Sequence, residues 1–86
     1  MTESGQDAIA RAHALGVLRD AVIGDRVVVR AHHGGGARDA LGVLVARTAD
    51  AVVIDTRRGA VEVALADVVA AKPVPPPPAP RSRRAP

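Results

Sequence analysis

The sequence predicts a small all-β domain, and two patterns support that prediction. Short runs rich in valine and isoleucine alternate with polar residues between positions 26 and 72, which is the period of a half-buried strand. Glycine and aspartate separate these runs at the short intervals typical of tight turns. The 86 residues allow one domain at most. We divide the chain into a leader (1–22), the patterned domain (23–72) and a proline-rich basic tail (73–86).

The alanine-rich leader has two interpretations. Asp7 is a residue type favoured just before a helix, so a short helix could run from Ala8 to Arg19. Gly16 weakens that interpretation, because glycine costs up to about 1 kcal/mol inside a helix. A short helix and a flexible leader therefore both remain open.

Five short strands are expected in the patterned domain, over residues 26–32, 40–48, 51–57, 60–65 and 69–72. The glycine-rich stretch 33–39 predicts a flexible loop after the first strand. Gly42 predicts a bulge or a sharp bend inside the second strand. Residues 66–68 predict one helical turn before the last strand.

This layout is that of a small five-stranded SH3-like barrel, whose closure removes the exposed edges of the sheet. An open five-stranded meander is the alternative. The chain has no aromatic residue, so the core must be aliphatic. The expected core residues are Val27, Val29, Leu41, Leu44, Val52, Ile54, Val61, Val63, Leu65 and Val68.

Composition excludes several classes of function. The chain has no cysteine, which excludes disulfides and zinc–thiolate sites and fits a cytoplasmic location. No run of about 18 apolar residues is present, so we expect no membrane span. The lack of aromatic side chains also excludes a methyl-lysine cage and a groove for proline-rich peptides.

Two histidines before three glycines, His32-His33-Gly34-Gly35-Gly36, suggest a metal site or a phosphate-binding loop. Neighbouring strand residues point to opposite faces, so both imidazoles cannot easily reach one ion. The glycines also lack the spacing of a phosphate-binding motif. No serine, threonine and base form a recognisable catalytic set. We therefore expect no metal, no cofactor and no enzyme activity.

The net charge of +3 resides in the tail. Residues 1–72 carry nine basic and nine acidic side chains, and the excess comes from Arg81, Arg83 and Arg84. A neutral domain attracts nucleic acid weakly, and no aromatic ring is present to stack on a base. If the domain does bind RNA or DNA, the expected contacts are Arg26, Arg30, Arg57 and Arg58.

The prolines of the tail favour an extended polyproline II spacer, and residues 81–86 are expected to be disordered. The Pro77–Pro80 spacing could instead make the tail a ligand for an aromatic groove on another protein.

Four stretches carry a resemblance to a known family: residues 24–30 (GDRVVVR), 39–42 (DALG), 56–59 (TRRG) and 66–76 (ADVVAAKPVPP). Together they resemble the N-terminal SH3-like domain of certain actinobacterial GNAT-type N-acetyltransferases, over about residues 24–80. The last stretch is the most specific. In that family the proline segment leads into an acetyl-CoA-binding catalytic domain, which this chain lacks, so no catalytic or cofactor residue can be carried over.

The resemblance implies a non-catalytic accessory or interaction domain. Its expected partner is a GNAT-type acetyltransferase domain or another protein. A small barrel that binds RNA or DNA is the alternative.

Overall fold

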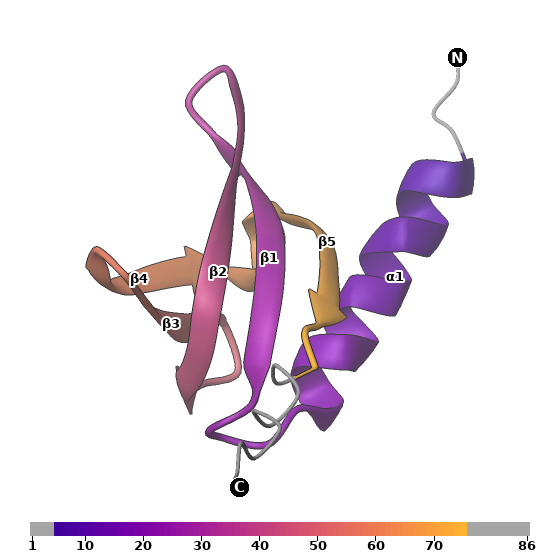
Figure 1. The fold of residues 1–86 in the computed structure, drawn as a ribbon. Helices are drawn as coiled ribbons and strands as arrows, with labels where there is room; N and C mark the ends of the chain where they lie inside the picture. The colour runs from indigo at the N-terminus through magenta and orange to yellow at the C-terminus, as the bar shows by residue number, and fades with distance from the viewer. Residues whose placement is uncertain (1–4, 76–86) are drawn as a thin grey trace, which may run out of the picture.

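The computed structural model describes the main chain of residues 5–75 and the side chains of residues 8–75. One N-terminal helix, α1 (Gly5–Asp20), precedes a single antiparallel sheet of five strands (Figure 1). The strands are β1 (Arg26–His33), β2 (Gly36–Arg47), β3 (Ala51–Thr56), β4 (Gly59–Ala64) and β5 (Val68–Pro73). The expected helical turn before the last strand is a 3₁₀ turn over Leu65–Asp67. The mostly β prediction is confirmed, while the predicted disorder of residues 81–86 and the Pro77–Pro80 motif lie outside the described residues.

The predicted flexible loop over residues 33–39 is wrong. β1 and β2 continue through it as a long hairpin, with Arg30 opposite Asp39 and His33 opposite Gly36. Only Gly34 and Gly35 form the turn, and Gly34 adopts a φ of 60°. Glycine reaches this left-handed conformation without steric cost, which allows such a tight connection. The hairpin extends beyond the rest of the sheet (Figure 1).

β2 is shared between two partners along its length. It pairs with β1 from Gly36 to Val43 and with β3 from Gly42 to Arg47. At the overlap, a Cβ on Gly42 would lie 2.8 Å from the carbonyl carbon of Asp55, so only glycine permits this approach of β2 to β3. The bulge in this strand does not lie at Gly42, where both ladders are regular. The register of β2 against β3 shifts instead between Leu44 and Ala46.

The sheet has two edges, because its strand order is β4-β3-β2-β1-β5 and no ladder among the described residues joins β4 to β5. Helix α1 packs beside β5 (Figure 1). The outer edge of β4 has no strand or helix beside it among residues 5–75. Helix α1 therefore packs along the β5 edge of the sheet, whereas the β4 edge is open among the described residues.

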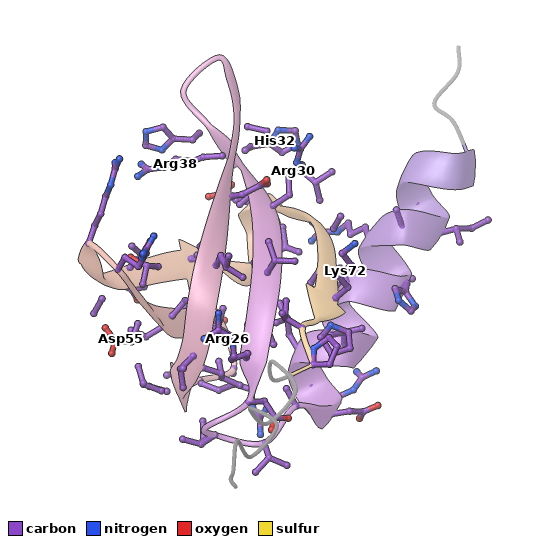
Figure 2. All side chains as sticks on the ribbon, viewed as in Figure 1. Arg26, Arg30, His32, Arg38, Asp55 and Lys72 are labelled. Carbon is purple, nitrogen blue, oxygen red and sulfur yellow. The ribbon has the colours of Figure 1, made fainter. Side chains whose placement is uncertain are left out.

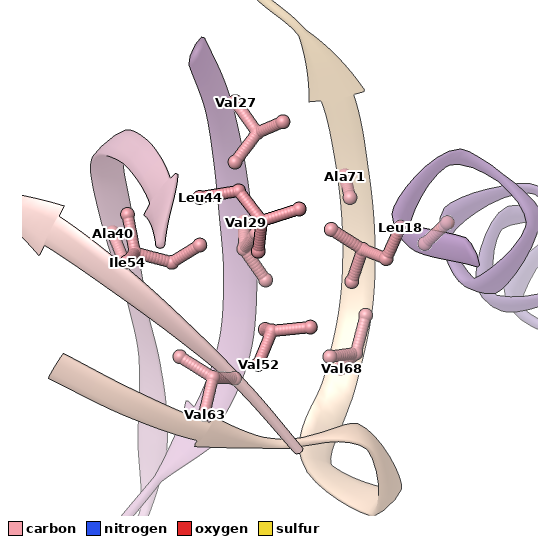
Figure 3. Packing of buried hydrophobic residues seen from close by; sticks show 11 residues of the cluster. Leu18, Val27, Val29, Ala40, Leu44, Val52, Ile54, Val63, Val68 and Ala71 are labelled. Atoms are coloured by element: carbon pink, nitrogen blue, oxygen red, sulfur yellow. The ribbon is translucent and has the colours of Figure 1, made fainter. Parts of the chain in front are cut away.

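The core is aliphatic, as predicted, but the helix contributes to it. Seven expected core residues are buried, namely Val27, Val29, Leu44, Val52, Ile54, Val63 and Val68. Val61 and Leu65 are partly buried, and Leu41 is 49% exposed, which contradicts its assignment to the core. The unexpected members are Ala14, Leu18, Ala40 and Ala71. Figure 3 shows Leu18 of α1 facing Ala71 and Val68 of β5.

Two arginines attach α1 to the sheet. Arg11 Nη1 donates to the carbonyl oxygens of Ala66 (3.1 Å) and Val68 (2.9 Å). Arg47 Nη1 donates to the carbonyl oxygens of Leu18 (2.8 Å) and Ala21, where a cation also stabilises the negative end of a helix. The flexible-leader interpretation is therefore wrong. The helix spans Gly5–Asp20, so Asp7 lies inside it and not just before it, as predicted from the sequence.

Candidate functional site

The four arginines expected to contact nucleic acid do not gather at one place. Arg57 and Arg58 form the turn between β3 and β4, where they line a groove that neither Arg26 nor Arg30 lines. Arg26 opens β1 and Arg30 lies further along the same strand, toward its hairpin end (Figure 2). Arg57 and Arg58 therefore lie in the groove, whereas Arg26 and Arg30 lie on β1 outside it.

Arg30 already has an anionic partner. Its Nε donates to Asp39 Oδ1 at 2.9 Å, and Nη2 lies 3.4 Å from Oδ2. The hydrogen bond from Arg30, aided by its charge, lowers the pKa of the Asp39 carboxyl below its ordinary value. The same hydrogen bond and the Asp39 charge raise the pKa of Arg30. Both side chains are about half exposed, so this is a solvated cross-strand pair whose charges offset each other.

The groove has a volume of about 560 Å³. It lies between the outer part of the β1–β2 hairpin and the β3–β4 hairpin, and we call it the hairpin groove. It is defined here by Ala31, Arg38, Leu41, Arg57, Arg58 and Val61. Among residues 8–75, no carboxylate lies within 4.0 Å of its three arginines. Three guanidinium groups and an apolar lining can bind an anionic group beside an apolar one.

Arg38 makes one contact inside the groove. Its Nη1 lies 3.2 Å from His33 Nε2. A guanidinium nitrogen can only donate, so Arg38 is the donor of any hydrogen bond between the two side chains. His32 and His33 also line the groove. Within the described part of the chain, no three His, Asp or Glu side chains are placed to hold a metal ion.

A second surface lies at the other end of the sheet. Val22 (66% exposed), Ile23 (51%) and Val45 (42%) form what we call the end patch. The α1–β1 loop is held against β2 there, because Gly24 N–H donates to the Leu44 carbonyl at 2.8 Å. Val74 N–H donates to the Arg26 carbonyl at 2.9 Å, so the chain leaves the sheet at this same end (Figure 1). Sequence patterns missed the patch because its residues come from a turn and from a distant strand.

No protein-family model, no curated protein and no solved structure matches this chain. No helix in residues 5–75 is long and apolar enough to cross a membrane.

Proposed function

We propose that this chain is a non-catalytic, SH3-like accessory domain whose partner is a GNAT-type N-acetyltransferase domain. The observation that carries the proposal is the position of the end patch beside Val74, where the chain enters its proline-rich segment. In the family that this chain resembles, that segment leads to the catalytic domain. An acetyltransferase domain that docks at this end of the sheet would contact the exposed Val22 and Ile23, close to the start of the proline-rich segment.

The order of the elements supports the SH3-like part of the proposal. The final strand returns to pair with β1 after a 3₁₀ turn, as in the predicted barrel layout. The term describes a shape, because a chain without aromatic side chains cannot build a proline-binding groove.

The character of the surface supports binding over catalysis. Among residues 8–75 no polar or charged side chain is buried. Catalytic acids, bases and nucleophiles usually acquire their reactivity from burial or from a closely placed charge. The described surface instead offers exposed arginines and exposed aliphatic side chains, which suit an interface.

Co-expression tests the proposal. An acetyltransferase reading frame is expected directly downstream of this one, and its product should co-purify with the tagged chain. A Val22→Asp plus Val45→Asp variant should lose the acetyltransferase, because a charge in the end patch would have to be desolvated on docking. Ile9→Asp, which changes an exposed position on α1, is the matched control. A wild-type chain that retains no acetyltransferase would contradict the proposal.

Nucleic-acid binding remains the second candidate, and the three arginines of the hairpin groove favour it. Retention on immobilised RNA or DNA should then fall steeply with salt. It should be lost on Arg57→Ala plus Arg58→Ala, and kept by a variant that ends at Pro75. Retention that disappears with the tail alone would contradict this second candidate.

A further inference from the structure

We propose that the hairpin groove binds an extended, acidic peptide segment of the partner protein, which adds as a strand along the free edge of β4. This inference rests on the proposed accessory role and names the chemistry of the segment that the domain recognises.

The first argument is that the outer edge of β4 has no paired strand among the described residues. β4 (Gly59–Ala64) pairs with β3 along one side, and no described strand pairs with its other side. An edge of this kind presents unpaired N–H and C=O groups, on which an extended peptide can form a further ladder. The opposite edge of the sheet is covered by α1. Val61, Glu62 and Val63 of β4 line the hairpin groove, so an added strand would lie within it.

The second argument is the distribution of the arginines. Arg11 and Arg47 are held by main-chain carbonyls, and Arg30 is paired with Asp39. Arg38, Arg57 and Arg58 have no carboxylate partner among residues 8–75, and all three line the groove. They approach it from two hairpins, so an extended segment crossing it would meet positive charge from both. Carboxylates are the side chains that match these guanidinium groups.

The third argument separates a peptide from a nucleic acid. Asp39, Glu62 and Asp67 also line the groove, and their charges would repel a backbone that carries a phosphate at every nucleotide. They would repel acidic peptide side chains too, but a peptide can place uncharged residues beside them. The chain has no aromatic ring on which bases could stack. A peptide can place acidic side chains near the arginines and apolar ones near Leu41 and Val61, since alternate residues of a strand face opposite sides.

Fluorescence anisotropy tests the proposal with a labelled peptide of alternating valine and glutamate residues. The full chain should bind this probe, and Arg57→Glu plus Arg58→Glu should weaken binding by at least about tenfold. Arg19→Glu, a charge reversal at an exposed position of α1 outside the groove, should change binding by less than about twofold. A fully N-methylated version of the peptide should bind much more weakly, because it cannot donate main-chain hydrogen bonds. Circular dichroism of each variant establishes that it is folded.

Several outcomes would overturn the proposal. One is equal binding of a valine–lysine peptide, and another is unchanged binding by the Arg57→Glu plus Arg58→Glu variant. Tighter binding of oligothymidine or oligouridine, lost in the same variant, would assign the groove to nucleic acid. A concentration-dependent dimer in sedimentation that the peptide cannot compete away would assign the β4 edge to a second copy of the chain.

The proposed function is tested separately on the same proteins. If the acetyltransferase still co-purifies while the peptide fails to bind, only the groove proposal is contradicted. If the wild-type chain retains no acetyltransferase, the accessory role is contradicted whatever the peptide does.

Discussion

Gly42 shows how one residue controls the distance between two strands. Its Cα lies against the main chain of Asp55 and Thr56, where any side chain would overlap backbone atoms. Backbone cannot move aside as the end of a flexible side chain can, so relief would require β2 and β3 to separate. That separation would disturb the packing of Leu44 against Ile54, which are partners across these strands.

Gly42→Ala is therefore expected to lower the free energy of unfolding by about 1–3 kcal/mol, the usual cost of overpacking. Urea unfolding followed by circular dichroism measures it. Gly35→Ala is the matched control, because no atom lies within 4 Å of a Cβ built there. The control should be neutral or slightly stabilising. Equal stability of the two variants would contradict the close approach of β2 to β3.

Asp39 gives a pH-dependent prediction. Its hydrogen bond with Arg30 lowers the pKa of the carboxyl in the folded state. A group with a lowered folded-state pKa stabilises the fold above its unfolded pKa, and this contribution is lost as the pH falls through the folded-state pKa. Asp39→Asn should lower the melting temperature slightly at neutral pH and leave it unchanged in acid, where the wild-type carboxyl is also neutral. Because the pair is half exposed, added salt should shrink the difference.

Leu41 shows why part of the core was misassigned from the sequence. Apolar character places a residue on a strand but does not decide its face, which depends on register. The glycine-rich composition of residues 33–39 is typical of a loop and does not predict the register between β1 and β2. In the structure Val29 lies opposite Ala40, so Ala40 shares the core face and Leu41 the other. The alternation in β3, by contrast, is local, and the burial of Val52 and Ile54 was predicted correctly.

At the scale of the element, α1 is the feature that sequence patterns described least well. Leu15, Val17 and Leu18 pack on the core, whereas Ile9, the other larger apolar residue of the helix, is 70% exposed. Its buried residues are Ala14 and Leu18, one turn apart. A small alanine gave no signal of burial, yet it permits the close packing of the helix on β5. The contacts of Arg11 and Arg47 with carbonyls are long-range, and no local pattern reveals them.

Leu18→Ala should destabilise the fold by about 2–5 kcal/mol, because it leaves a cavity between α1 and β5. At roughly 0.05–0.15 kcal/mol per residue, a chain of 86 residues has a total stability of about 4–13 kcal/mol, so the variant loses a large share of it. Ile9→Ala, at an exposed position of the same helix, should have almost no effect. Urea titrations of both variants make the comparison. Equal stability would show that the helix does not contribute to the core.

At the scale of the whole molecule, an uncharged stretch separates the sheet from the excess charge. The last described main-chain hydrogen bond to the sheet is from Val74, residues 73–80 carry no charge, and the excess arginines begin at Arg81. The charge count does not show which arginines bind a main-chain carbonyl or a carboxylate and which have no such partner. That depends on the groups that the fold brings near each arginine. Net charge was thus readable from the sequence, but the location of accessible charge was not.

Truncation after Pro75 should therefore lower the net charge of the protein without changing its stability. We expect the urea midpoint and circular dichroism spectrum of this variant to match those of the full chain, because the variant keeps the whole buried cluster that the structure describes, from Ala14 to Ala71. Its net charge should fall to zero, since Arg81, Arg83 and Arg84 account for the excess. Retention on a cation exchanger at neutral pH should fall accordingly. A matched full-length variant, with these three arginines changed to glutamine, should elute with the truncated one. A truncated protein that melts several degrees lower would show that residues 76–86 stabilise the fold, and one that keeps its retention would show that the groove arginines dominate the accessible charge.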